Sequence, residues 1–201
     1  MDKLLTVVIP SYNVEKFLNQ TLDSFVCDEA VMKKFEVIVV DDGSKDSTAK
    51  IGKEYADKYP DTFRVISKEN GGHGSTINCG IRNAVGKYFK VVDGDDWVNT
   101  ADFVKLVEDL EKTESEYVFT NYNEYYDDVN RQKSVDFPQF KDGTEYDFAD
   151  VANKVYIPMH ALVIKTSVLK DNNIVIDEKC FYVDVEYVMF PVPFVNKVTF
   201  F

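Results

Sequence analysis

Short apolar runs that alternate with stretches of helical periodicity are the feature that most limits how this chain can fold. The first two runs, Leu4–Ile9 and Phe35–Val40, are continuous, which is typical of a strand buried on both faces. We expect a third strand at Phe63–Ser67 and a fourth at Tyr88–Val92. Strands that alternate with helices favour a parallel sheet with right-handed crossovers. We therefore expect an α/β fold with a mostly parallel central sheet flanked by helices.

The second half of the chain is less regular. Tyr117–Tyr125 has the pattern of a fifth strand, and Tyr126–Asp150 is polar and has the composition of an excursion or linker. We expect a helix over Asp184–Val195 up to its prolines. The chain stops on the apolar run Val198–Phe201, which suggests a domain truncated at its C-terminus. Residues 1–98 and 99–201 are interpreted as two halves of one domain.

Charge and cysteine content limit the functional classes. The net charge of −12 argues against a nucleic-acid partner, because phosphate backbones require a basic protein face. It also means that binding a small anion requires a cation between ligand and protein. The three cysteines form no CxxC pair, which fits a reduced cytoplasmic compartment. No apolar run approaches the roughly 18 residues of a membrane span, so we expect a cytoplasmic chain, with peripheral membrane contact left open.

Unusual polar segments follow all four strands of the first half. They are PSYN (Pro10–Asn13), DDGS (Asp41–Ser44), ENGGHGS (Glu69–Ser75) and DGDD (Asp93–Asp96). Each alone has an ordinary interpretation as a turn. In an open α/β sheet, however, the carboxyl ends of parallel strands share one edge, and ligands bind there. We therefore expect the four segments to converge on one site.

The closely spaced aspartates after the fourth strand predict a metal site. Carboxylate oxygens alone suit a hard divalent cation, Mg²⁺ or Mn²⁺, which is usually completed by substrate phosphates. The segment lacks the ligand spacing of an EF-hand, and the chain has neither GxGxxG after the first strand nor a P-loop. A cation held by Asp95 would let this acidic chain bind a diphosphate. For Asp96 we expect no more than a cap on the following helix.

These motifs together resemble the family 2 glycosyltransferases of GT-A fold. The resemblance covers Leu4 to Trp97 and rests on PSYN, on DDGS followed by Asp46, on NGG with the later NCGI, and on DGDDW. A weaker match continues in IDEKCFYVDVEY, Ile176–Tyr187. The resemblance implies a GT-A-type sandwich with a smaller acceptor-side region.

The resemblance also implies roles for individual residues. Donor binding would involve Pro10, Tyr12, Asn13, Asp41, Asp42, Asn70, Gly71 and Asp93. Asp42 would accept from an N–H of the nucleotide base, Asp95 would be the principal metal ligand with Asp93 beside it, and Asp184 would be the general base. The expected reaction is an inverting transfer from a nucleotide sugar, with uridine implied, to a glycan or lipid-linked acceptor in bacterial surface polysaccharide synthesis.

The sequence departs from the family pattern at two positions. Ile77 occupies the position of a common arginine, and Val183 replaces an acidic neighbour of Asp184. Lys68, Lys87 or Arg82 are candidates to replace the missing positive charge. Because of these departures, a nucleotide-sugar-binding domain without catalytic activity remains an alternative interpretation of the chain. A nucleotidyltransferase is a further alternative, although PSYN is not the basic glycine-rich loop that it requires.

Several single residues have two interpretations. Asp184 is also a plausible N-cap for a helix from Val185. His160 lies in an apolar stretch and is interpreted first as a structural histidine. Contact with the acceptor or the diphosphate is the alternative. His73 is equally suited to a structural role and to substrate contact, and Trp97 to a buried role and to stacking on a sugar. A homodimer is left open.

Overall fold

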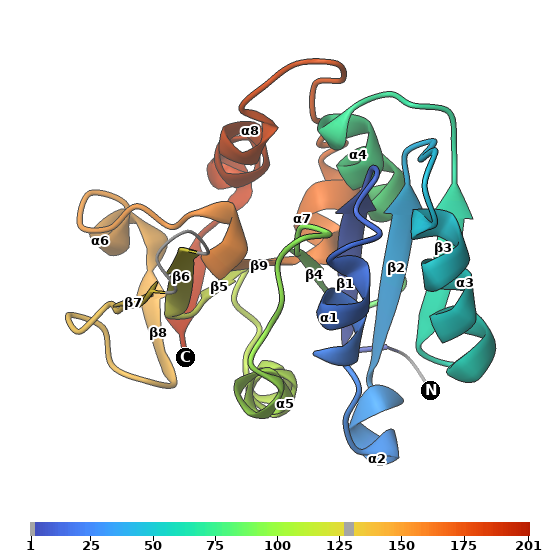
Figure 1. Ribbon diagram of the computed structural model, residues 1–201. Helices are drawn as coiled ribbons and strands as arrows, with labels where there is room; N and C mark the ends of the chain where they lie inside the picture. The colour runs from blue at the N-terminus through green and yellow to red at the C-terminus, as the bar shows by residue number, and fades with distance from the viewer. Residues whose placement is uncertain (1–2, 127–130) are drawn as a thin grey trace.

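A sheet of eight strands runs through the protein, and the computed structural model describes residues 3–126 and 131–201 (Figure 1). The strands are β1 (Leu5–Ser11), β2 (Phe35–Asp41), β3 (Phe63–Ser67), β4 (Tyr88–Val91), β5 (Tyr117–Phe119), β8 (Thr144–Asp147), β9 (Leu162–Lys165) and β10 (Lys197–Phe200). They lie in the order β3-β2-β1-β4-β9-β5-β10-β8.

The first four strands are parallel, as predicted from the alternating pattern. Strand β9 is antiparallel to both of its neighbours, β4 and β5, and it joins the two halves of the chain into one sheet. Strand β10 is parallel to β5, and β8 closes the edge in the antiparallel direction. The fold is therefore α/β with a mostly parallel central sheet.

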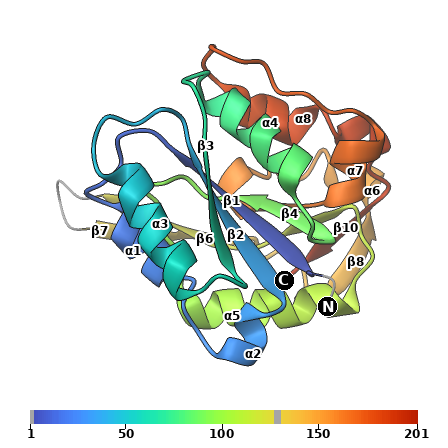
Figure 2. The same ribbon diagram turned by 90° about the vertical axis from the view of Figure 1, so that its right-hand side faces the viewer.

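Helices cover both faces of the sheet (Figure 2). One face carries α1 (Leu18–Asp23), α2 (Glu29–Met32), α3 (Thr48–Lys58) and α5 (Thr100–Asp109). The other face carries α4 (His73–Asn83), α7 (Thr166–Asp171) and α8 (Val183–Met189), and the short α6 (Phe148–Val151) follows β8. Single 3₁₀ turns lie at Leu110–Lys112, Met159–Ala161 and Val192–Phe194.

The continuous apolar runs arise because β1 and β2 are buried on both sides. All seven residues of each strand are buried. Successive side chains of a strand point to opposite faces. Val8 therefore belongs to the apolar cluster that includes Ile77 of α4, while Val7 belongs to the cluster that includes Leu22 and Phe103.

The predicted single strand Tyr117–Tyr125 is wrong. The chain leaves the main sheet after β5 and forms β6 (Tyr122–Tyr126), which pairs only with β7 (Arg131–Val135) in a separate antiparallel ribbon. Asn121, between the two strands, accepts a hydrogen bond from Phe137 N through its side-chain oxygen at 2.9 Å. That contact stabilises the change of direction.

The predicted polar excursion Tyr126–Asp150 is also wrong in its described part, because it contains β7, β8 and α6. Residues 127–130 lie outside the described residues. Two aromatic residues hold the segment to the core: the rings of Phe137 and Phe140 lie 5.4 and 5.1 Å from that of Phe119. The segment is polar because β7 and the outer face of β8 are exposed.

The helix expected over Asp184–Val195 up to its prolines is present. It is α8, which ends at Met189, two residues before Pro191. The apolar run at Val198–Phe201 is explained by burial, since β10 lies between β5 and β8.

Two further observations concern the whole described chain. No helix within residues 3–126 and 131–201 combines the length and apolar character needed to cross a bilayer. The three cysteines, Cys27, Cys79 and Cys180, are unpaired.

Two buried tyrosines provide a matched test of the core around α8. The hydroxyl of Tyr117 donates to Val188 O at 2.7 Å, whereas the buried hydroxyl of Tyr187 has no partner in the described part of the chain. Tyr117→Phe should lower the free energy of unfolding by about 1–2 kcal/mol, because it leaves a buried carbonyl unpaired. Tyr187→Phe should leave it unchanged or raise it by up to about 1 kcal/mol. Urea denaturation measures both, and an equal loss in the two variants would contradict the assignment.

Candidate active site

Four loops meet at the carboxyl edge of the parallel strands, as the sequence predicted. Asp42 N donates to Ser11 O at 2.8 Å, which joins the loops after β2 and β1. Gly94 N donates to Pro10 O at 3.2 Å, which joins the loops after β4 and β1. The loop after β3 contacts the Asp42 side chain directly. This edge is therefore one continuous surface.

The PSYN loop combines an exposed ring with a structural amide. Tyr12 is 50% exposed. Asn13 adopts a left-handed backbone (φ 56°), which asparagine tolerates, and its side-chain oxygen accepts from Lys45 N at 2.8 Å. Asp46, just before the N-cap residue Ser47, accepts from Thr48 N, the first residue of α3, at 2.9 Å.

The Asp42 carboxylate is almost fully buried and holds the NGG loop. Its Oδ1 accepts from Lys68 Nζ at 2.6 Å and from Gly71 N at 3.0 Å, and its Oδ2 accepts from Gly72 N at 2.8 Å. Asn70 Nδ2 donates to the Asp42 carbonyl at 3.0 Å. Both oxygens that the resemblance assigns to the nucleotide base thus already accept hydrogen bonds from the loop.

Asp41 is buried in the same way. Its Oδ1 accepts from Ser44 N at 3.0 Å, within the turn that follows β2. Of the predicted donor residues, Asn13, Asp41, Asp42 and Asn70 thus all use side-chain atoms to hold loops together.

None of the three cations suggested as replacements for the missing arginine is free at this edge. Lys68 is bound to Asp42. Lys87 pairs with Glu114 at 2.7 Å, just before the start of β4 and thus at the opposite edge of the sheet. Arg82 lies in the last turn of α4, roughly 13 Å along the helix from His73 at 1.5 Å per residue.

The DGDD segment forms a turn at the end of β4, in which Asp96 N donates to Asp93 O at 3.0 Å. Asp93 is partly exposed and Asp95 is exposed, so their carboxylates are open to a ligand. Desolvation by the surrounding protein, together with the charges of Asp93 and Asp95, raises the pKa of Asp96 to about 6, although its side chain is exposed. The turn therefore concentrates negative charge that a cation would relieve.

The expected role of Asp96 as a helix cap is wrong. The cap of α5 is Asn99, whose side-chain oxygen accepts from Ala101 N and Asp102 N at 3.0 and 3.2 Å. The connection after Asp96 is longer than the sequence pattern suggested.

A pocket of about 270 Å³ brings residues of the two halves together. It is lined by His73, Asp93, Met159, His160, Cys180, Phe181, Tyr182, Val183 and Asp184. A larger pocket, of about 630 Å³, lies between Lys105, Asp142 and Phe201 and contains none of the predicted site residues. The smaller pocket is therefore the candidate active site.

His73, the first residue of α4, lies beside Asp93. Its Nε2 is 3.0 Å from Asp93 Oδ1, but this buried nitrogen makes no well-directed hydrogen bond with the described residues. Burial lowers the pKa of His73, and the carboxylates of Asp93, Asp184 and Asp95 outweigh it, so the net pKa is above its ordinary value. The surrounding carboxylates therefore favour the protonated form of this imidazole.

Asp184 is the second residue of α8, and its side chain accepts no hydrogen bond from the described part of the chain. The helix begins at Val183 after Tyr182, which occupies the N-cap position, so the alternative role of Asp184 as N-cap is wrong. Asp184 lines the pocket and interacts electrostatically with His73.

The remaining aromatic candidates lie on the surface. His160 is exposed, lines the pocket and packs against Tyr122 at 4.6 Å, so it is not a buried core residue. Trp97 is 42% exposed and contacts the Tyr125 ring edge-on at 5.5 Å. Neither ring belongs to the apolar core.

Three features of the site were missed at the level of sequence. Lys90 is buried, and its Nζ donates to His160 O at 2.7 Å; a lysine inside an apolar strand was the available signal. Phe181 and Tyr182 are 90% and 80% exposed at the pocket, inside the motif assigned to the acceptor side. Asn78 pairs with Ile176 across the fold, and no local pattern indicates this contact.

Comparison with known proteins identifies the family. Residues 6–172 match the model described as Glycosyl transferase family 2. This chain belongs to glycosyl transferase family 2. The matched range includes all four converging loops and ends before Asp184.

Curated relatives within the family are bacterial. The chain is 38% identical over 118 residues to the uncharacterized glycosyltransferase EpsJ of Bacillus subtilis, covering 59% of this chain and 33% of EpsJ. It is 33% identical over 111 residues to the minor teichoic acid biosynthesis protein GgaB of the same organism, covering 55% and 12%. The chain thus spans a third or less of these two relatives.

Solved structures show the same fold. TarS of Staphylococcus aureus, crystallised with UDP-GlcNAc, superposes with a TM-score of 0.80 at 23% identity, over 98% of this chain and 56% of that one. The mannosyltransferase PcManGT of Pyrobaculum calidifontis, in complex with GDP-Man and Mn²⁺, gives 0.69 at 18% identity, over 100% and 55%. The mixed sheet is thus of GT-A type.

The Asp42 carboxylate should be required to hold the family's NGG loop. Asp42→Asn replaces one acceptor oxygen by a donor facing Gly72 N–H, so it should lower the free energy of unfolding by about 2 kcal/mol. It should also speed amide hydrogen exchange at Gly71 and Gly72. The control Asp57→Asn, at an exposed residue of α3, should cost no more than about 0.5 kcal/mol. Equal stability of the two variants would contradict this role.

Proposed function

We propose that this family 2 chain is an inverting, metal-dependent glycosyltransferase. It moves a sugar from a nucleotide-diphosphate sugar to a hydroxyl of a glycan or lipid-linked acceptor in bacterial cell-surface polysaccharide synthesis. The observation that carries this proposal is the pocket in which Asp93, after a donor-side strand, and Asp184, on α8, line the same space. The complexes of TarS with UDP-GlcNAc and of PcManGT with GDP-Man and Mn²⁺ support this donor class.

The residues at the end of β4 fit a divalent cation. Asp95 and Asp93 offer exposed or partly exposed carboxylate oxygens, which are the ligands that Mg²⁺ and Mn²⁺ prefer. Asp95 would be the principal ligand, with Asp93 beside it. When bound, such a cation neutralises charge on the departing diphosphate.

Asp184 would act as the general base. Its carboxylate takes the proton of the acceptor hydroxyl, whose oxygen then attacks the anomeric carbon from the face opposite the nucleotide. The bond between the anomeric carbon and the phosphate oxygen breaks, and its electron pair leaves with the nucleoside diphosphate. One displacement inverts the anomeric configuration, and no protein nucleophile is needed.

Exposed rings at the pocket suit the acceptor. Phe181 and Tyr182 present aromatic surface at its rim, while Asp93 and Asp184 present oxygens that can accept from sugar hydroxyls. Aromatic surface beside polar groups suits a ligand with both apolar and hydroxyl-bearing faces, such as a sugar ring.

The two departures from the family pattern lie in the core. Ile77 is fully buried, and Val183 is 3% exposed although it lines the pocket. A catalytically silent binding domain is thus an outcome of the experiments below and not a second proposal. Family membership and the lack of a basic loop after β1 disfavour a nucleotidyltransferase.

Nucleotide binding should depend on metal and on Asp95. With Mn²⁺, saturating UDP or UDP-sugar at about 100 times its Kd should stabilise the protein by about 2.7 kcal/mol, which raises the Tm by roughly 5 °C or more. Removing metal with EDTA, or introducing Asp95→Ala, should abolish the shift. Thermal-shift assays with UDP, GDP and their sugars make the measurement and identify the nucleotide base of the donor.

An equal shift without metal would contradict the bridging role of the cation. An equal shift in Asp95→Ala would remove that residue from the site. If only GDP gave the shift, the proposed enzyme class would stand, and the donor nucleotide would contain guanine in place of uracil.

Turnover should depend on the Asp184 carboxylate. Asp184→Asn keeps the shape and removes the basic oxygen, so kcat for release of nucleoside diphosphate should fall about 10²- to 10⁴-fold. The Mn²⁺-dependent thermal shift should be kept. Asp171→Asn, at an exposed residue of α7, is the control and should change neither property. Unchanged turnover in Asp184→Asn would exclude it as the base, and a wild-type chain that consumes no donor would favour the silent binding domain.

A further inference from the structure

The segment Ile176–Tyr182, called the strap below, crosses the N-terminal half of α4 on its way to α8. Its first residue is paired with the buried side chain of Asn78. Asn78 Nδ2 donates to Ile176 O at 2.7 Å, and Ile176 N donates back to Asn78 Oδ1 at 2.9 Å. The amide thus binds the strap as a neighbouring strand would, with both of its ends engaged.

Glycines of the ENGGHGS segment allow the strap to approach closely. A Cβ on Gly74 would overlap the Asp177 carbonyl oxygen, a backbone atom, so the strap would have to shift to make room for it. A Cβ on Gly72 would lie 3.2 Å from Lys179 N. Lys179 N in turn donates to Gly71 O at 3.1 Å. The strap therefore lies directly on the loop that Asp42 holds.

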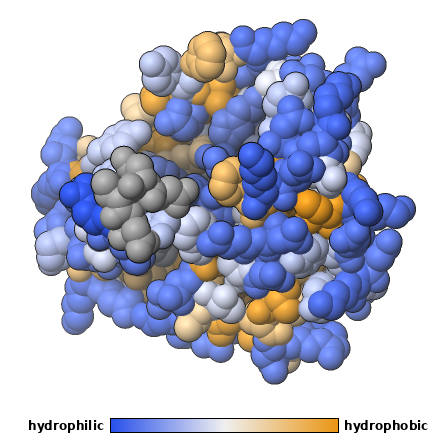
Figure 3. Space-filling model, viewed as in Figure 1, coloured by the Kyte–Doolittle hydropathy of each residue, from blue (hydrophilic) through white to orange (hydrophobic). Residues whose placement is uncertain are grey.

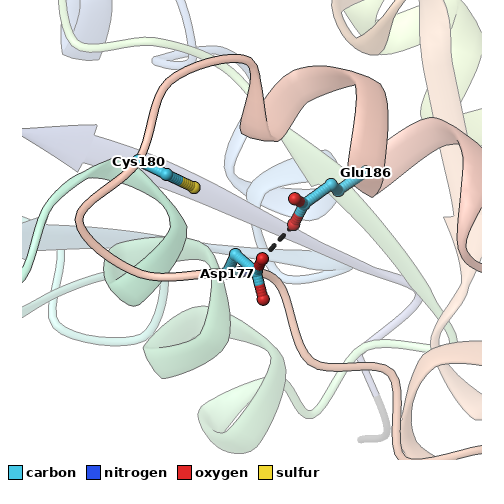
Figure 4. A group of neighbouring side chains, drawn as sticks. All are labelled: Asp177, Cys180 and Glu186. Atoms are coloured by element: carbon cyan, nitrogen blue, oxygen red, sulfur yellow. Dashed lines mark hydrogen bonds between the residues drawn. The ribbon is translucent and has the colours of Figure 1, made fainter.

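The other side of the strap is tied to α8. Asp177 N donates to Glu186 Oε2 at 2.8 Å, and Figure 4 shows Asp177 and Cys180 of the strap beside Glu186 of the helix. Lys179 and Tyr182 both adopt left-handed backbones, with φ of 59° and 65°. Such residues cost of order 1–3 kcal/mol each and persist where their surroundings hold them. Asp184 follows two residues after the second of these turns.

The surface around the strap and α8 carries exposed apolar side chains. Figure 3 shows apolar side chains over α8, and Phe181, Tyr182 and Met189 are exposed there. Packing of these side chains therefore contributes little to holding the strap. Apart from Ile176, which is fully buried in the apolar core, the strap is held by its polar contacts with α4 and α8.

We propose that Asn78 is a positioning residue for Asp184, an inference that rests on the proposed function. Asn78 acts through the strap and does not touch the substrate. Helix α4 begins at the donor-side NGG loop and also carries Asn78. It therefore sets the distance between the donor site and Asp184. A displacement of the strap moves Asp184 relative to Asp93 while the donor loops, held by Asp42, stay in place.

The test compares Asn78→Ala with Asn83→Ala. Asn83 lies on the same helix, and its side-chain amide donates to Cys79 O within α4 at 2.9 Å. In Asn78→Ala, kcat for release of UDP or GDP from the donor should fall at least about tenfold, with donor KM changed less than about threefold. The Mn²⁺-dependent thermal shift should persist. Amide exchange over residues 176–186 should speed up at least about tenfold, with β1, β2 and β4 unchanged.

Gly74→Ala gives an independent route to the same displacement. It leaves the Asn78 amide intact and pushes the strap away from α4 with a Cβ at Asp177 O. It should reproduce the loss of kcat and the faster exchange, so the proposal is decided even if Asn78→Ala does not fold. Asn83→Ala should behave as wild type in every measurement.

Slow exchange of residues 176–186 in both strap variants would overturn the proposal, and so would fast exchange with kcat unchanged. A general loss of stability, with donor binding and kcat falling together, would show a merely structural role. A wild-type chain that releases nucleotide from no donor would overturn the proposed function instead, and the exchange rates would then decide whether Asn78 holds α8.

Discussion

The Asp42 carboxylate is the interaction on which the rest of the site depends. A buried charge is tolerated only when it is paired and fully hydrogen-bonded, and this one is met by Lys68 and by the amides of Gly71 and Gly72. Because these amides belong to the loop that leads into α4, the carboxylate determines where α4 begins. The start of α4 in turn places His73 beside Asp93 and supports the strap that leads to Asp184.

The two halves of the chain are joined by polar contacts that cross a continuous sheet. Lys90 on β4 donates to His160 O, and Asn78 on α4 pairs with Ile176. Both contacts begin on donor-side elements and end on segments that line the candidate pocket or lead into it. The geometry between donor and acceptor sides is thus determined by a few buried donors and acceptors, each of which costs free energy if left unpaired.

The sequence predicts the donor half well and the acceptor half poorly, for a physical reason. Strands β1, β2 and β4 are buried on both faces, so they are easily recognised, and the polar exits of all four donor-side strands stand out. Strands β7 and β8 are exposed on one or both faces, and their segment is held through Phe137 and Phe140. The insertion of β9 between β4 and β5, and the pairing of Asn78 with a residue 98 positions later, depend on tertiary contacts that leave no local pattern.

Aspartates of similar motifs also perform different tasks, and residue type alone does not separate them. Asp41 ends β2 and Asp42 follows it, and both are buried, with oxygens that accept from backbone amides. Asp95, after β4, is exposed, and Asp184, in the first turn of α8, lines the pocket. Only the second kind can exchange a proton or a ligand without first breaking an internal hydrogen bond. A motif match therefore identifies the family, while the accessibility of each carboxylate indicates which aspartates carry the chemistry.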